Sequence, residues 1–402
     1  MASRIYFDHS ATTPLDPRVI VAMEPYLDGA FGNPSSLHRE GRKARKAVET
    51  ARAQVAALFG ADPSEIVFTG SGTEADNLAI LGAVRMNDGP AHVVTSSIEH
   101  PAVLEPCRFL ERFGAKVDYL PVDTHGLVDP ESLRGTLCPE TRLVSIMAAN
   151  NVVGTLQPLP ELARITKQHG ALFHTDAVQA AGKIRLDVNQ LPADLISLSA
   201  HKLHGPKGVG ALYVRRSVEL SPIVFGGGQE RGLRSATENV AGIVGFGGAA
   251  ALAREGMEEE ASEQVKLREQ ILTRLRATVP HAYLIGHPVK RLPGHLCLGF
   301  AGQENQIFQL LVALDEAGVA VSSGSACSAH HANAPSAILL AMGFDSQRAH
   351  GSLRVTLGRF STESEVNRFL EILPRALAAL APAVSRAEPA WNAELNVAQT
   401  GI

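Results

Sequence analysis

The chain has 402 residues, a formal net charge of −4 and 45% hydrophobic residues, which is typical of a globular protein with a sizeable core. This charge gives no basis for binding nucleic acid or anionic membranes, no apolar run reaches the roughly 18 residues of a spanning helix, and four scattered cysteines exclude a disulfide framework or zinc site. The start, MASRIYFDHS, has neither a signal-peptide core nor a transit segment, so we expect a soluble cytoplasmic protein without a bound metal.

Short apolar runs alternate with amphipathic segments over the first half of the chain. Seven runs are predicted to be strands: residues 65–70, 91–97, 116–122, 142–151, 171–176, 194–200 and 210–215. Residues 74–87 and 158–170 carry helical patterns between them. This alternation predicts an α/β fold with a mostly parallel, doubly wound sheet that is covered by helices on both faces.

The pattern changes in the second half. Residues 240–280 are rich in Ala, Glu, Arg and Leu, which predicts one or two long helices. Three short β-like runs follow, GHLCLGF, VAVSSGSAC and SLRVTLG, and a helix is expected from about Glu363. We therefore expect a large domain over residues 15–260, a small α+β domain that combines residues 1–14 with 261–385, and a loosely held tail over 386–402.

The segment EIVFTGSGTEADNLAI predicts a strand, a glycine-rich turn and a helix. The amides of Gly72 and Thr73 would open this helix, and a helix amino terminus suits a phosphate. A capped turn, with Ser71 or Thr73 as the cap, explains the same residues without a ligand. His100 follows the next strand and is either a loop histidine or an imidazole that stacks on a cofactor ring and moves protons.

Asp176 closes an apolar run, and Lys202 follows in SAHKLHGPK between two histidines. A pyridoxal-phosphate enzyme needs this pair, because a lysine amine forms a Schiff base with the cofactor aldehyde and a carboxylate keeps the pyridine nitrogen protonated. The alternatives are a helix cap for Asp176 and a surface lysine for Lys202. Asn150 and Asn151, at an earlier strand end, stabilise a turn or contact the cofactor or a substrate carboxylate.

Three further polar residues flank the pair and suit the same cofactor. Gln179 would donate to the phenolic oxygen of the cofactor, and Ser199 and His201 would donate to its phosphate. They stand in HTDAVQ and SLSAHK, on or beside apolar runs that read as buried strands.

Cys327 stands in VSSGSACSAHH, a small, polar stretch after an apolar strand. A free cysteine is most often a buried small hydrophobe, but this setting favours an accessible nucleophilic thiolate on a mobile loop. Cys107, Cys138 and Cys297 lack such a setting, and no function is predicted for them. Arg354, in SLRVTLG, either binds a carboxylate with two hydrogen bonds or forms a surface ion pair.

The ordered set of motifs is more specific than its parts. It resembles the cysteine desulfurases, the NifS-like group of pyridoxal-phosphate enzymes with the class V aminotransferase fold, a fold type I architecture. The resemblance extends from residue 6 to residue 362. It rests on YFDHSATTP, FGNPSS, GSGTEADN, ANNVVG, HTDAVQ, SAHKLHGPKG, FGGGQERGLRSATEN, SSGSAC and SLRVTLGRFST.

The resemblance implies pyridoxal 5′-phosphate as the cofactor. Lys202 would form the Schiff base and His100 would stack on the ring and move protons. Asp176 would pair with the pyridine nitrogen and Gln179 with the phenolate oxygen. Thr73, Ser199 and His201 would hold the cofactor phosphate, and Gly72 and Asn151 would also contact the cofactor.

The resemblance also implies a reaction and partners. Asn151 and Arg354 would bind the carboxylate of L-cysteine. Cys327 would attack the substrate sulfur, take it as a persulfide and leave L-alanine, and an acceptor such as an iron–sulfur scaffold protein would then receive the sulfur. Thr237, in RSAT, would reach the phosphate of a second subunit, which implies a homodimer.

Two features depart from the family pattern. Ala236 stands where the family usually has Gly. The loop SAHHANAPSAILLAMG after Cys327 has the length of the long-loop subgroup but is also similar to selenocysteine lyases. SSGSAC favours a desulfurase, and a selenocysteine lyase is the alternative. More distant alternatives are a hydrolase or epimerase of the same fold, which needs no nucleophilic cysteine, and a cofactor-free interaction protein, which would be expected to lack some of Lys202, Asp176 and His100.

Overall fold

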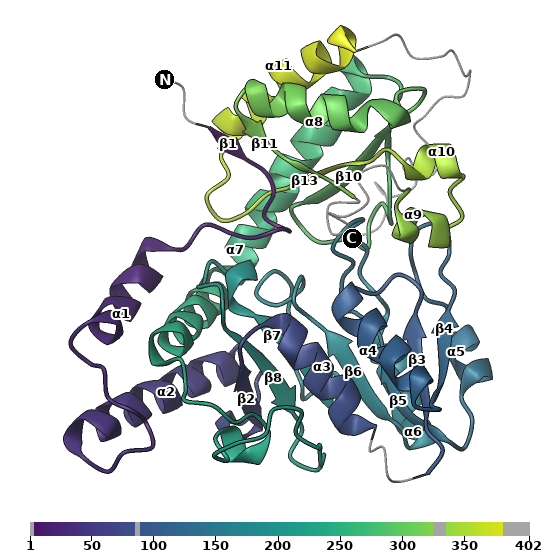
Figure 1. The fold of residues 1–402 in the computed structure, drawn as a ribbon. Coiled ribbons are helices and arrows are strands. Elements are labelled where there is room, and N and C mark those ends of the chain that lie inside the picture. Colours follow the sequence, from purple (N-terminus) through teal and green to yellow (C-terminus); the bar gives the residue numbers. More distant parts are fainter. Residues whose placement is uncertain (1–3, 85–88, 325–334, 381–402) are drawn as a thin grey trace.

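The computed structural model describes residues 4–84, 89–324 and 335–380, and its larger sheet has the strand order β2-β8-β7-β6-β5-β3-β4 (Figure 1). Its strands are β2 (Ile66–Thr69), β3 (His92–Ser96), β4 (Lys116–Leu120), β5 (Thr141–Ser145), β6 (Leu172–Asp176), β7 (Leu195–Ser199) and β8 (Gly210–Val214). Strand β8 is antiparallel to both neighbours, and the other pairs are parallel. Each strand coincides with one of the seven apolar runs, so the predicted mostly parallel sheet is confirmed.

Helices cover both faces of this sheet, as a doubly wound fold requires. Alternate strand residues enter two separate cores, for example Val67 and Val93 in one and Phe68 and Val94 in the other. The helices of this part are α1 (Pro17–Leu27), α2 (Arg39–Ala57), α3 (Gly72–Ala83), α4 (Pro101–Arg112), α5 (Pro130–Thr136) and α6 (Leu159–His169). Helices α3 and α4 pack into the core of Val67, and the others pack into the core of Phe68.

The helix boundaries follow from local chemistry. Asp16 caps α1 and Pro17 occupies its first position, where a missing N–H costs nothing. Gly170 ends α6 at a φ of +93°, a conformation that favours glycine. Helix α3 begins two residues before the predicted start of its segment, and residues 85–88 lie outside the described part.

A second sheet has four antiparallel strands in the order β12-β13-β10-β9. They are β9 (Ala282–Leu284), β10 (His295–Phe300), β12 (Ser322–Ser323) and β13 (Leu353–Thr356). Strand β1 (Ile5–Tyr6) pairs in parallel with β11 (Val319–Ala320). The accompanying helices are α8 (Ile307–Glu316), α9 (Ala337–Ala341), α10 (Ser346–Ala349) and α11 (Glu363–Ala379). Ile5 and Phe7 share a core with residues of this second sheet and of α11, so the segment before α1 packs against elements from the second half of the chain.

Helix α7 (Val240–Thr278) is one continuous helix of 39 residues that connects the two sheets (Figure 1). Phe246, near its start, packs on the larger sheet, and Leu267 and Ile271 pack in the core of the second sheet. The domain limits of residues 15–260 and of 1–14 with 261–385 remain our proposal, and residues 386–402 lie outside the described part. No helix within the described ranges is long and apolar enough to cross a membrane.

Candidate active site

A cavity of about 600 Å³ lies at the carboxyl ends of the parallel strands. Asp176 ends β6, Lys202 follows β7 and His100 follows β3, so three distant segments converge there. All predicted site residues line this cavity, except Thr237 and Cys327. The lining residues are Ser10, Ala11, Thr12, Ser71, Gly72, Thr73, Asp76, His100, Met147, Ala149, Asn151, Asp176, Val178, Gln179, Ser199, His201, Lys202, Lys207, Gly208 and Arg354.

The amino terminus of α3 opens into the cavity. Ser71 caps the helix, since its Oγ accepts the Glu74 amide at 3.0 Å, and Thr73 is exposed. A Cβ at Gly72 would lie 2.8 Å from Val178 Cγ2, so only glycine brings the helix this close to the strand ends. This start of a 12-residue helix offers backbone amides and a positive dipole end to an anion.

The N-terminal segment holds Lys202 in place. Lys202 Nζ donates to the backbone oxygen of Ser10, and to that of Ala11 at 2.7 Å. His201 Nδ1 lies 3.1 Å from Thr12 Oγ1, and burial lowers the pKa of His201 to about 4, so its ring is neutral near pH 7. Lys202 is therefore a partly buried amine inside a lined cavity, and the alternative of a surface lysine does not hold.

Asp176 is 8% exposed and accepts the Val178 amide at 2.8 Å. Burial raises its pKa, although His100 and Lys202 act in the opposite direction. A cation facing this carboxylate would keep it ionised at neutral pH, because a buried carboxylate is stable only when its charge is compensated. The protonated nitrogen of a pyridine ring is such a cation, so the site fits pyridoxal phosphate.

Two more buried carboxyl groups lie beside Asp176, and neither was predicted from the sequence. Asp76 lines the cavity at 1% exposure, and burial together with Asp176 raises its pKa. Glu99 accepts from Ser96 Oγ at 2.6 Å and from the Met147 amide, and burial raises its pKa to about 8. Glu99 is therefore mostly protonated near pH 7, and burial makes Asp76 hold a proton more readily than an ordinary aspartate.

His174 is a buried neighbour of Asp76. Its ring nitrogens lie 2.8 Å from Ser145 Oγ and 2.9 Å from Ser197 Oγ, and Nε2 is 3.6 Å from Asp76 Oδ1. Burial lowers the pKa of His174 to about 3, so the ring is neutral. A sequence signal for this residue existed: His174 stands two positions before Asp176 and so shares one face of β6.

His100 caps helix α4, where its Nδ1 accepts the Ala102 amide at 3.1 Å. This hydrogen bond uses the lone pair of Nδ1, so Nε2 is the ring nitrogen that carries a proton. His100 lines the cavity as predicted, so it is both a cap and a cavity residue.

The two neighbouring asparagines have different roles. Asn150 is buried and stabilises its own turn, donating to Ile98 O and accepting the Val152 and Val153 amides. Asn151 lines the cavity. The turn-stabilising role therefore belongs to Asn150, and contact of Asn151 with a cofactor or substrate stays a prediction.

Arg354 is a buried cation, and the alternative of a surface ion pair is wrong. It is 2% exposed on β13 and lines the cavity. Nη1 donates to Asn151 O at 3.0 Å and Nη2 to Asp8 Oδ1 at 2.9 Å. Nε has no hydrogen-bond partner within the described residues. Such a guanidinium is suited to a carboxylate ligand.

Gln179 is oriented by two neighbours. Its Nε2 donates to Ser10 O at 2.9 Å, and its Oε1 accepts from Lys183 Nζ at 3.4 Å. Burial, together with the positive charges of Lys202 and Arg354, lowers the pKa of Lys183 to about 7. The amide keeps a second N–H for the cavity, as the predicted contact with the cofactor requires.

Thr237 is exposed and does not line the cavity of its own chain. Its loop is strained, with positive φ at Glu230 (48°), Arg231 (60°) and Ala236 (147°). A buried ion pair anchors the loop, because Arg52 contacts the Glu230 carboxylate at 2.7 and 2.8 Å. Cys327 lies outside the described residues.

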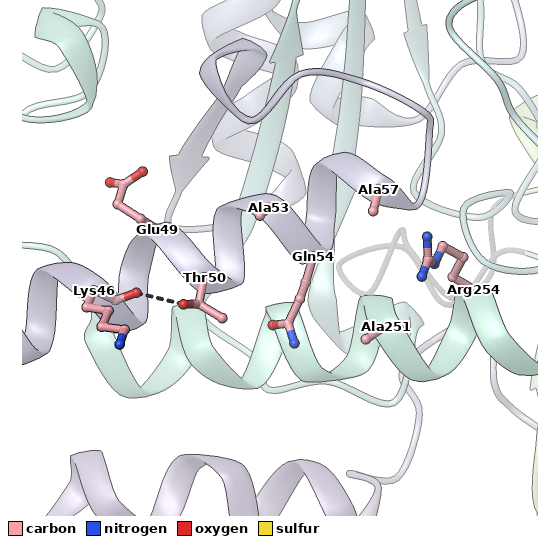
Figure 2. Close-up of a pocket in the computed structure, with 8 residues that line it drawn as sticks. All are labelled: Lys46, Glu49, Thr50, Ala53, Gln54, Ala57, Ala251 and Arg254. Atoms are coloured by element: carbon pink, nitrogen blue, oxygen red, sulfur yellow. Dashed lines mark hydrogen bonds between the residues drawn. The ribbon is translucent and has the colours of Figure 1, made fainter.

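A second hollow of about 550 Å³ lies between α2 and α7 (Figure 2). Thr50 Oγ1 donates there to Lys46 O at 2.9 Å, which is an ordinary contact within a helix. It contains no predicted site residue. Its lining residues are Lys46, Glu49, Thr50, Ala53, Gln54, Ala57, Ala251 and Arg254.

Comparisons with known proteins agree with the fold and the site. The aminotransferase class-V family model matches residues 5–369. A Dictyoglomus turgidum protein named cysteine desulfurase IscS is 45% identical over 378 residues, which cover 94% of this chain and 95% of that protein. A solved NifS-like protein has a TM-score of 0.87 at 40% identity and covers 94% of this chain and 100% of its own. A structure described as SspA in complex with cysteine has a TM-score of 0.78 at 35% identity, covering 89% and 100%. The chain therefore belongs to the class-V aminotransferase family, in the group of the NifS-like cysteine desulfurases.

Proposed function

We propose that this chain removes sulfur from L-cysteine with pyridoxal 5′-phosphate as cofactor, leaving L-alanine and a persulfide on Cys327. The observation that carries the proposal is the convergence of the Lys202 amine, the buried Asp176 carboxylate and the start of α3 on one cavity. Relatives at about 45% identity that are named cysteine desulfurases support the same reaction.

The residues of the cavity fit the parts of the cofactor. Pyridoxal phosphate, when bound, supplies an aldehyde that joins the substrate amine and a ring that accepts electrons from the substrate. Lys202 would hold the aldehyde carbon and move protons at its Nζ. Asp176 would hold a proton on the pyridine nitrogen, His100 would stack on the ring, and Gln179 would donate to the phenolic oxygen. The remaining contacts with the cofactor would come from Gly72, Thr73, Asn151, Ser199 and His201.

The substrate would be oriented by its carboxylate. Arg354 offers a buried positive charge, and Asn151 lies beside it through a backbone hydrogen bond. The Cys327 thiolate would attack the substrate sulfur, so that an S–S bond forms, the C–S bond breaks and the substrate carbon takes a proton. A sulfur-acceptor protein, such as an iron–sulfur scaffold, would then receive the sulfur. We place this reaction in the cytoplasm.

The central experiment follows the sulfur and the cofactor separately. Borohydride treatment should fix the cofactor covalently on Lys202, as seen by peptide mass spectrometry. Incubation with cysteine should give alanine and a persulfide on Cys327. Cys327→Ser should keep the cofactor absorbance and form no persulfide, and alanine release at the wild-type rate in this variant would contradict the proposal. Comparing turnover of cysteine with that of selenocysteine tests the alternative, a selenocysteine lyase.

The proposal includes a homodimer in which Thr237 completes the phosphate site of the other subunit. The exposure of Thr237 on an anchored, strained loop supports this assignment. Mixing Thr237→Val chains with Lys202→Ala chains tests it. Each mixed dimer would contain one site with both Lys202 and Thr237 intact, so activity should return on mixing. No recovery, with dimers present in sedimentation, would contradict it.

A further inference from the structure

Cys138, His92 and Asp118 meet at the edge of the larger sheet that lies opposite to the cavity. His92 begins β3, Asp118 lies in the neighbouring strand β4, and Cys138 precedes β5 on the other side. The strand order β5-β3-β4 brings them together, since β3 pairs with both neighbours. None of the three lines the cavity, so the cluster is separate from the proposed active site.

The three side chains stand in the order of a thiol, a base and a group that orients the base. Cys138 Sγ lies 3.2 Å from His92 Nδ1, and His92 Nε2 lies 3.0 Å from Asp118 Oδ2. His92 is 1% exposed, whereas Cys138 is only partly buried. The imidazole is therefore fixed, and the sulfur can be reached by a small reagent.

Asp118 determines which nitrogen of His92 carries the proton. An ionised carboxylate only accepts, so Nε2 donates to Asp118 and Nδ1 presents a lone pair to the thiol. Burial, together with Lys116, lowers the pKa of His92, so the ring is neutral and can accept a proton. Thr141 Oγ1 lies 2.8 Å from the same Nδ1, so the Thr141 hydroxyl and the Cys138 thiol both face this nitrogen.

The charges that face the thiol are mixed. Lys116 Nζ is 2.6 Å from Asp118 Oδ2, which offsets much of its charge, and the Glu140 carboxylate interacts with Cys138 directly. A positive field alone therefore does not activate this sulfur. His92 Nδ1, at 3.2 Å from Cys138 Sγ, is the group placed to take the thiol proton.

We propose that Cys138, His92 and Asp118 form a thiol-exchange site that takes up small disulfides. His92 Nδ1 accepts the thiol proton while the Cys138 sulfur attacks one sulfur of the disulfide. A new S–S bond joins Cys138 to half of the reagent, and the reagent's own S–S bond breaks. The departing thiolate takes the proton from His92. The step needs no other oxidant or reductant and does not depend on the proposed desulfurase reaction.

Two other cysteines provide controls within the same molecule. Cys107 and Cys297 are fully buried, and burial raises the pKa of their thiols to about 12 and about 11. A reagent that labels Cys138 through simple unfolding would label these two as well. Preferential labelling of Cys138 therefore reports on the folded site.

The test treats the cofactor-loaded full chain with bis(2-hydroxyethyl) disulfide at neutral pH and follows each cysteine peptide by mass spectrometry. Cys138 should form the mixed disulfide much faster than Cys107 and Cys297. His92→Gln should slow the Cys138 reaction by roughly 100-fold, the lower limit of what a positioned base contributes. Asp118→Asn should slow it by a smaller factor, and the exposed substitution Glu105→Gln should not change it.

Cys138→Ser identifies the modified peptide and should leave cysteine turnover unchanged, because Cys138 is remote from the cavity. If His92→Gln does not fold, Asp118→Asn still tests the proposal. The Asp118 side chain is 35% exposed, so this substitution should leave the fold intact. A Cys138 rate no greater than those of Cys107 and Cys297 would overturn the proposal. An unchanged Cys138 rate in folded His92→Gln or Asp118→Asn would do the same.

Discussion

The two edges of the larger sheet use polar residues in opposite ways. At the carboxyl ends of the strands, Asp176 and Lys202 line a cavity, and burial raises the pKa of Asp176. At the amino ends, the hydrogen bond from Lys116 lowers the pKa of Asp118, which also contacts His92. The cavity therefore holds a buried acid whose pKa is raised, whereas the opposite edge holds a partly exposed acid whose pKa is lowered by the cation beside it.

The largest effect that this comparison predicts is for Lys202→Ala. Turnover of cysteine should fall by at least about 1,000-fold, because the substitution removes the amine that is proposed to hold the cofactor aldehyde. The free energy of unfolding of the cofactor-free protein should change by less than about 1 kcal/mol. Activity assays and urea unfolding measure the two quantities. Lys202→Arg keeps the charge without the nucleophile, and recovery of activity in that variant would contradict the role.

Arg354→Gln should weaken substrate binding more than catalysis. We expect KM for cysteine to rise about 100-fold, the effect of removing one partner from a buried charge pair. Arg354→Lys restores the charge without the two-pronged geometry and should recover only part of the loss. Steady-state kinetics give both constants, and a fall in kcat at constant KM would argue against carboxylate binding.

At the opposite edge, Thr141→Val should cost stability and not activity. Thr141 Oγ1 contacts His92 Nδ1 and accepts the Cys138 amide at 2.9 Å, so the substitution leaves buried polar groups without a partner. The expected loss is about 2 kcal/mol in urea unfolding. Cysteine turnover below the unfolding transition serves as the control. A loss of turnover without a loss of stability would show that this edge of the sheet contributes to catalysis, as the cavity edge does.

Glu99→Gln should flatten the pH dependence of stability. The pKa of Glu99 is about 8 in the folded protein and near 4.5 when unfolded, so folding takes up a proton between these values. Its contribution to stability is complete below pH 4.5 and is lost as pH rises toward 8, at up to about 1.4 kcal/mol per unit. Urea unfolding at several pH values should show a smaller slope in the variant. Glu105→Gln is the exposed control, and equal slopes in both variants would show that Glu99 is ionised.

Ala236→Gly is expected to have the smallest effect. Ala236 has a φ of +147°, which L side chains rarely adopt, so glycine should relieve strain and stabilise the protein by about 1 kcal/mol. Thermal unfolding measures the gain. Ala115→Gly, at a position without positive φ, should instead lose about 0.5–1 kcal/mol. Destabilisation at both positions would show that the loop at Ala236 is not strained.

The positions of the main site residues could be predicted because they follow strands. His100, Asp176 and Lys202 each come directly after an apolar run, and parallel strands end at a common edge. The seven strands could be recognised in the sequence because strands that are buried on both faces consist of short apolar runs. The antiparallel direction of β8 leaves no such mark in the sequence.

The residues that sequence reasoning missed depend on which strands are neighbours. No local pattern in the sequence marks Glu99. Burial raises its pKa, and this burial depends on β3 lying beside β5. Cys138 was assigned no function because its partner His92 is 46 residues away in the chain. Arg354 was predicted as either a carboxylate ligand or a surface ion pair, and the sequence did not show that the central position of β13 in its sheet buries it.

The hydrogen bonds between the two ends of the chain have a consequence for biosynthesis. Arg354 donates to Asp8, and the Ser10 amide donates to Thr356 Oγ1 at 3.0 Å. These contacts span 346 residues, so they form only after nearly the whole chain has left the ribosome. The larger sheet can fold earlier, but the carbonyl groups that hold Lys202 reach their places only when the N-terminal segment docks. A nascent chain that stops before β13 would therefore have the sheet without a finished cavity.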